Sequence, residues 1–173
     1  MHATRLANAS SDQAVVEVYD KLTTDLKINP DIKPRVVFAR DTRASGPRLV
    51  SALLAAFNAS GTEYTDYKLL TTPQLHYITR CLNTKGTPYE YGEPTEQGYY
   101  QKMGASFKAA TGTRKFNGPV TVDCANGVGG PKLVELLKYL PSLSEGGLEI
   151  KVVNDDVLRP EHLNHQVSVA SLK

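Results

Sequence analysis

The chain has 173 residues, of which 40% are hydrophobic and 22% are charged, and its formal net charge is +2. This composition is typical of a globular protein that buries a core, and it excludes a chain without a folded core. The basic residues form no run and are not interleaved with aromatic residues, so we expect no nucleic-acid partner. No apolar stretch approaches the roughly 20 residues that span a bilayer, and none marks a signal peptide. We therefore expect no membrane partner and a cytoplasmic location.

The N-terminal part of the chain predicts a helix, a strand and a second helix. Apolar residues at helical spacing predict one helix over residues 3–27, with a stop at residues 29–31. The continuous apolar run at residues 36–39 predicts a buried strand. A second helix is expected after Ser45, a candidate N-cap, and Gly61 ends it.

The rest of the chain continues the alternation of strands and helices. Strand, helix, helix, strand, helix and strand are predicted over residues 62–70, 71–82, 95–110, 120–122, 132–139 and 148–153. Glycines and prolines make residues 83–95 the best candidate for a linker. The alternation favours a three-layer α/β/α architecture, and the linker separates a first domain, 1–95, from a second, 96–173.

Three charged residues, Arg40, Asp41 and Arg43, follow the first predicted strand. Ligand sites in open α/β sheets lie beyond the carboxyl ends of strands. Two guanidinium groups flanking a carboxylate could hold a phosphate through paired hydrogen bonds. The alternative, which residue types alone favour, is structural: Asp41 pairs with one arginine and both brace the loop.

Thr71 and Thr72 follow the second predicted strand, directly before Pro73. Their hydroxyl groups could cap the next helix, which is the commoner role, or contact a ligand. His76, farther along that helix, is expected to be packed or solvated rather than catalytic. His162 and His165 lie three residues apart without further ligands nearby, so we expect no metal site.

A glycine-rich turn at residues 123–130 lies between a predicted strand and a predicted helix. It does not match the dinucleotide-binding pattern G-x-G-x-x-G, because Lys132 occupies the third glycine position. The pattern therefore favours a tight structural turn, with Asn126 in the left-handed conformation or as a cap.

Four segments resemble those of eukaryotic, fungal-type phosphoacetylglucosamine mutases, a family of the α-D-phosphohexomutase superfamily. The sequence at residues 39–43 is similar to the superfamily's GRDTR element, with Ala39 in place of glycine. Residues 69–77, 96–102 and 122–129 resemble the family's LLTTPQLHY, EGYYQK and VDCANGVG segments. The resemblance implies three-layer domains with mixed sheets, in which 1–95 is the rear part of domain I and 96–173 the front part of domain II.

The resemblance implies an isomerase that interconverts N-acetylglucosamine 6-phosphate and 1-phosphate in UDP-N-acetylglucosamine biosynthesis. The family uses a phosphoserine loop that reads roughly T-A-S-H-N-P, a magnesium loop that reads D-G-D-A-D-R, and a glucose 1,6-bisphosphate activator. Neither loop occurs in the 173 residues, so the resemblance implies a fragment that is inactive alone, without catalytic residues, metal ligands or cofactors of its own.

Within the complete enzyme, the partner would be a sugar phosphate. The residues that would support the active site and its phosphate are Arg40, Asp41, Arg43, Thr71 and Thr72. The alternative function is that of a non-catalytic protein that binds sugar phosphates or the mutase itself. The oligomeric state is not indicated by the sequence.

Overall fold

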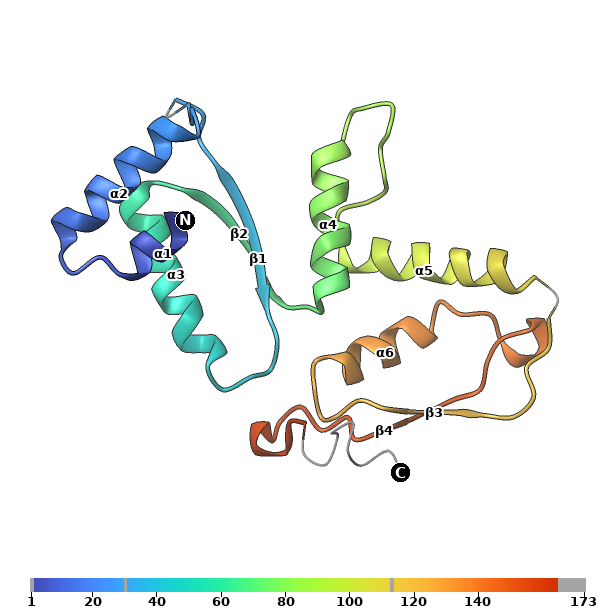
Figure 1. The fold of residues 1–173 in the computed structure, drawn as a ribbon. Helices are drawn as coiled ribbons and strands as arrows, with labels where there is room; N and C mark the ends of the chain where they lie inside the picture. The colour runs from blue at the N-terminus through green and yellow to red at the C-terminus, as the bar shows by residue number, and fades with distance from the viewer. Residues whose placement is uncertain (1, 30, 113, 165–173) are drawn as a thin grey trace. The chain divides into compact units, whose positions relative to one another are not determined.

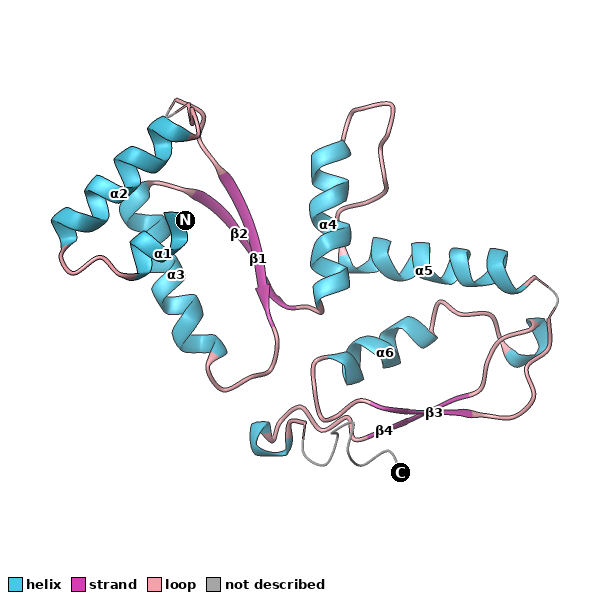
Figure 2. Ribbon diagram, in the orientation of Figure 1, coloured by secondary structure: helices cyan, strands magenta, loops and turns pink. Residues whose placement is uncertain are grey.

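The structure, a computed structural model, describes residues 2–29, 31–112 and 114–164. Figure 1 shows the course of the chain, and Figure 2 its helices and strands. By internal contacts the chain divides into two compact units, residues 1–35 and 36–173. None of the helices in the described ranges is long and apolar enough to cross a membrane.

The first unit holds two helices, α1 (His2–Ala7) and α2 (Asp12–Asp25), which contact each other. The prediction of a single helix over residues 3–27 is therefore wrong. Ser11 separates the two helices: its backbone is extended, and its side chain accepts a hydrogen bond from the N–H of Ala14 at 3.2 Å. A residue in this capping conformation cannot continue a preceding helix. Pro30, part of the predicted stop, lies outside the described residues.

The second unit begins with a strand–helix–strand segment. Strands β1 (Arg35–Arg40) and β2 (Glu63–Leu69) are neighbours in a two-stranded sheet, and α3 (Gly46–Ser60) connects them. The rings of Phe38, Phe57 and Tyr64 join the three elements, with centroids 5.3–6.1 Å apart. This segment confirms the predicted order of strand, helix and strand.

The two ends of α3 differ in how well they were predicted. Gly61 ends the helix in the left-handed conformation, at φ 65°, as its position suggested. Ser45 was expected to cap the start, which is wrong, because its side chain makes no capping hydrogen bond. Its backbone already has helical angles, φ −72° and ψ −19°, whereas a capping serine has an extended backbone.

Helices α4 (Thr72–Thr84) and α5 (Glu96–Thr111) contact each other and carry most of the buried core. The core cluster is formed by Leu70 together with Tyr77, Ile78 and Cys81 of α4. Residues 85–95 form no helix or strand, but they lie inside the compact unit 36–173, so the linker between two domains stays a prediction. The hydroxyl of Thr95 caps α5 by accepting from the N–H of Gly98 at 3.0 Å.

A second two-stranded sheet pairs β3 (Val120–Asp123) with β4 (Ile150–Val153). The strands are parallel, and their register runs from Val120 opposite Ile150 to Asp123 opposite Val153. Helix α6 (Gly129–Leu137) connects them and contacts β4 and α5, as Figure 1 shows. Two short 3₁₀-helices follow, Leu143–Glu145 and Pro160–His162.

The fold is therefore α/β, as predicted, with one sheet before residues 83–95 and one after them. Helix α6 begins three residues earlier than expected, because the glycines at its start adopt helical backbone angles. The assignment of 1–95 and 96–173 to two phosphohexomutase domains stays a prediction at this stage.

The contact between α5 and the chain after α6 depends on Gly104. A Cβ atom at this position would collide with the backbone oxygen of Tyr139, and backbone atoms cannot move aside as a flexible side chain can. We expect Gly104→Ala to lower the free energy of unfolding by about 1–3 kcal/mol, measured by urea denaturation. Gly129→Ala is the control, because a Cβ there meets nothing within 4 Å. Equal losses in both variants would contradict this account of the contact.

Candidate functional site

The loop after β1 is braced by Asp41. Its Oδ1 accepts from the backbone N–H of Arg43 at 3.0 Å, and its Oδ2 lies 3.4 Å from Nε of Arg43. Nη1 of Arg40 donates to the backbone oxygen of Asp41 at 3.3 Å. Asp41 thus pairs with one arginine and braces the loop, which is the structural role considered for it. These contacts use only part of the five N–H donors that each guanidinium group carries, so both arginines keep donors for a ligand.

The loop after β2 leads into the first turn of α4. The backbone N–H of Leu70 donates to the oxygen of Arg40 at 3.2 Å, which holds this loop beside the loop after β1. Thr71 is the N-cap residue, and Oε1 of Gln74 accepts from its backbone N–H at 2.9 Å. The contact is one half of a capping box. Thr71 therefore stands at the helix start as expected, through its backbone N–H, whereas Thr72 makes no capping contact among the described residues.

One cleft joins these two loops. Its volume is about 610 Å³, which lies within the usual range for small-molecule sites. The structure brings all the predicted support residues together along its wall: Arg40, Asp41, Arg43, Thr71 and Thr72. Asp41 is the only carboxylate among the residues that line it. Two arginines and a helix N-terminus therefore give the cleft a positive character, which suits an anion.

Three further residues of the cleft were not predicted as site residues. His76, expected to be packed or solvated, is exposed and lines the cleft from the second turn of α4. Val128 reaches the cleft from the glycine-rich turn of the second sheet. Gly46 allows close packing, because a Cβ there would lie 3.3 Å from Cδ of Arg40. Only the position of Gly46 after the Arg-Asp-Thr-Arg run offered a signal in the sequence.

The glycine-rich turn is structural, as its sequence indicated. Asn126 has φ 54° and Ala125 φ 52°, so these residues, rather than the glycines, adopt the left-handed conformation. The N–H of Asn126 donates to the oxygen of Asn154 at 2.6 Å, and its Nδ2 donates to the oxygen of His162 at 3.1 Å. Asn126 therefore ties the turn after β3 to the chain after β4.

A smaller cavity of about 180 Å³ lies between the loop after β1 and this turn. It is lined by residues 41–43, residues 127–129, Leu163 and Asn164. Oγ1 of Thr42 is buried beside it without a hydrogen-bond partner among the described residues. An unpaired buried hydroxyl is costly, so Thr42 is available to bond a small polar group at this place.

The described ranges contain no group of three or more His, Cys, Asp or Glu side chains that could hold a metal ion. His165, which was considered with His162, lies outside those ranges. No residue of the described part is therefore assigned to a metal.

Fold and cleft together define an α/β protein with a positively charged cleft beyond the ends of β1 and β2, where such folds place their ligand sites. A family model described as phosphoglucomutase/phosphomannomutase, alpha/beta/alpha domain I, matches residues 8–89. The chain belongs to the α-D-phosphohexomutase superfamily.

Within that superfamily the chain is similar to phosphoacetylglucosamine mutases. A curated relative of this description from Candida albicans is 42% identical over 94% of this chain and 31% of its own length. A crystal structure of the Aspergillus fumigatus N-acetylphosphoglucosamine mutase with glucose 1,6-bisphosphate is 56% identical, with a TM-score of 0.89, over 95% of this chain and 30% of that one. Another, with GlcNAc-6P and magnesium, is 55% identical, with a TM-score of 0.87, and covers 99% of this chain and 31% of that one. The chain thus spans about 30% of the length of these relatives.

Proposed function

We propose that the cleft between β1 and α4 holds the phosphate of a sugar phosphate as part of a phosphoacetylglucosamine mutase. The observation that carries the proposal is the convergence of Arg40, Arg43 and Thr72 on one cavity. Guanidinium groups bind phosphate oxygens through paired hydrogen bonds, and the N-terminus of α4 adds a partial positive charge. Asp41 orients Arg43 and leaves its other donors free for the ligand.

The substrate class is supported by what the relatives bind. The Aspergillus fumigatus enzyme has been crystallised with glucose 1,6-bisphosphate, and also with GlcNAc-6P and magnesium. The reaction we propose for the whole mutase is the interconversion of N-acetylglucosamine 6-phosphate and 1-phosphate, a step of UDP-N-acetylglucosamine biosynthesis. Magnesium and a glucose 1,6-bisphosphate activator belong to that complete enzyme.

Within the complete enzyme, the residues of the cleft would bind the substrate and would not transfer its phosphate. Residues 1–95 form the rear part of domain I, which agrees with the family match to residues 8–89, and 96–173 form the front part of domain II. The 173 residues contain no match to the family's phosphoserine or magnesium loop. The residues assigned to the cleft, including Thr71, would therefore bind and orient the sugar phosphate, while phosphate transfer needs the other loops.

The proposal predicts that N-acetylglucosamine 6-phosphate binds to the chain and that Arg43→Gln weakens this binding. Hydrogen bonds to charged groups contribute about 1.5–3 kcal/mol, so Kd is expected to rise about 10- to 150-fold. Isothermal titration calorimetry measures the change. Arg48→Gln is the matched control, because Arg48 is an exposed residue of α3 that does not line the cleft.

Arg48→Gln should leave Kd within about twofold of the unmodified chain, because Arg48 does not line the cleft and the field of an exposed charge is screened by salt. Equal weakening by both substitutions would indicate binding through overall charge rather than in the cleft. No binding by the unmodified chain would contradict the proposed function.

A further inference from the structure

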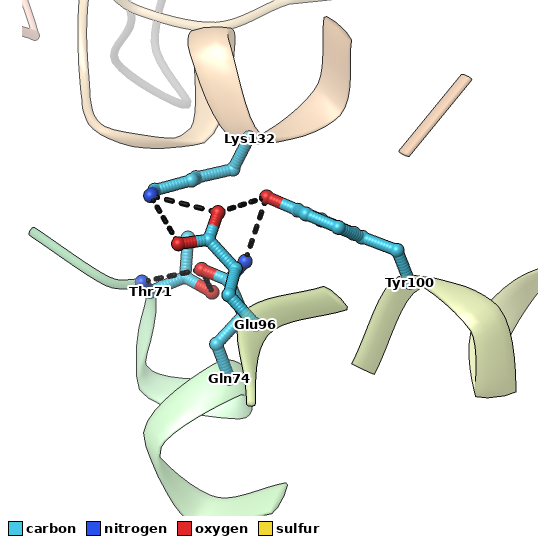
Figure 3. Close-up of polar contacts among 5 residues, drawn as sticks. All are labelled: Thr71, Gln74, Glu96, Tyr100 and Lys132. Carbon is cyan, nitrogen blue, oxygen red and sulfur yellow. Dashed lines mark hydrogen bonds and ion pairs between the residues drawn. The ribbon is translucent and has the colours of Figure 1, made fainter. Parts of the chain in front are cut away.

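A chain of polar contacts connects the cleft to α6 through the interior of the second unit. Five residues from the starts of α4, α5 and α6 take part, and we call them the polar relay: Thr71, Gln74, Tyr100, Glu96 and Lys132 (Figure 3). Gln74 lies at its centre and is only 1% exposed. This side chain is almost completely shielded from solvent, so its hydrogen bonds are made within the protein.

The donors and acceptors of these hydrogen bonds can be assigned by starting from the backbone N–H of Thr71. This N–H can only donate, so the Gln74 atom 2.9 Å from it is the amide oxygen Oε1. Oγ1 of Thr71 also lies 2.9 Å from Oε1. An amide oxygen only accepts, so the hydroxyl of Thr71 must donate its single proton to Gln74.

The remaining contacts agree with this direction. Nε2 of Gln74 donates to the hydroxyl of Tyr100 at 3.0 Å, and this hydroxyl in turn donates to Oε1 of Glu96. Nζ of Lys132 donates to both carboxylate oxygens of Glu96 at 2.8 Å. Burial raises the pKa of Tyr100, and its hydrogen bond to Glu96 adds to this effect, so the phenol keeps its proton. Each donor atom of the polar relay therefore has at least one acceptor within it.

The polar relay makes the two neighbouring threonines chemically different. The only hydroxyl proton of Thr71 is used by Gln74, so toward the cleft Thr71 can act only as an acceptor. Thr72 also lines the cleft, but it is exposed, and its hydroxyl has no hydrogen-bond partner among the described residues. The hydroxyl of Thr72 is thus free to donate to a ligand.

A phosphate group at neutral pH mainly accepts hydrogen bonds, whereas a sugar hydroxyl or an acetamido N–H donates them. Resting on the proposed function, we infer that Thr71 is a specificity residue that accepts a hydrogen bond from the sugar part of the ligand. Thr72 donates to the phosphate part. The polar relay favours this division. If the hydroxyl of Thr71 turned to donate to the ligand, Oε1 of the buried Gln74 would lose one of its two hydrogen bonds.

The inference is tested with two probes, N-acetylglucosamine 6-phosphate and inorganic phosphate, by NMR titration of the 173-residue chain. Thr71→Val keeps the shape of the side chain and the backbone contact to Gln74, and we expect it to weaken sugar-phosphate binding about 3- to 10-fold. Inorganic phosphate should bind this variant within about twofold of the unmodified chain. Thr71→Ser should restore sugar-phosphate binding, because it restores the hydroxyl.

Thr72→Val is the matched variant, and it should weaken the binding of both probes by a similar factor. Equal weakening of both probes by Thr71→Val, or no weakening of either, would overturn the inference while the proposed function stands. The NMR spectrum of each variant also reports whether it is folded, and Thr71→Ser covers the case in which valine is not tolerated. If the unmodified chain binds no sugar phosphate, the proposed function and this inference both fall.

Discussion

The 173-residue chain is expected to give no turnover of N-acetylglucosamine 6-phosphate, even with magnesium and glucose 1,6-bisphosphate present. Phosphate transfer needs a phosphoryl donor and a cation that offsets charge at the transferring group. The sequence contains no match to the phosphoserine loop or to the magnesium loop of the family that it resembles. A coupled assay for the 1-phosphate product should therefore give the same rate as buffer.

The control for this assay is binding of the same ligand by the same preparation. Bound sugar phosphate without turnover would show that the chain is folded and that its cleft is accessible. Turnover above buffer that a chelator abolishes would contradict the expectation. It would mean that residues of this chain transfer phosphate rather than support the site.

Replacement of Ile78 by alanine is expected to be the most damaging single substitution proposed here. Ile78 is fully buried, at 0% exposure, and belongs to the core cluster with Leu70, Tyr77 and Cys81. Removing its outer carbon atoms leaves a cavity in packed surroundings, which costs about 2–5 kcal/mol. The free energy of unfolding, measured by urea denaturation, should fall by this amount.

Ile32→Ala is the matched control, because the substitution removes the same atoms from a side chain that is 69% exposed. Surface substitutions usually change the free energy of unfolding by no more than about 0.5 kcal/mol. A loss of comparable size at both positions would contradict the placement of the core along α4.

The strands and most helix ends could be predicted from local sequence. The continuous apolar run at residues 36–39 indicated the strand β1, although only Phe38 of this run is buried and its neighbours are half-buried. Gly61 and Thr95 carry their end signals within a few residues of the helices that they bound. The break at Ser11 was missed because apolar residues keep their helical spacing on both sides of it, although Ser11 followed by Asp12 is itself a capping signal.

The sequence could predict only those site residues that directly follow a strand. The residues after β1 and β2 lie at strand ends, and the structure brings them to one cleft. Gln74 had a partial signal, since Thr-x-x-Gln is a capping-box pattern. The contacts of Gln74 with Tyr100 and of Glu96 with Lys132 span 26 and 36 residues. Such pairs follow from how α4, α5 and α6 pack, which spacing along the chain does not encode.

The cleft between β1 and α4 is proposed to hold a sugar phosphate. The most direct test is to titrate ¹⁵N-labelled chain with N-acetylglucosamine 6-phosphate and to follow every backbone amide by NMR. We predict saturable shifts concentrated in residues 40–46 and 70–76, the two segments that contribute the polar lining of the cleft, and little change in β4. Shifts confined to other regions, or no saturable shift at millimolar ligand, would contradict the claim.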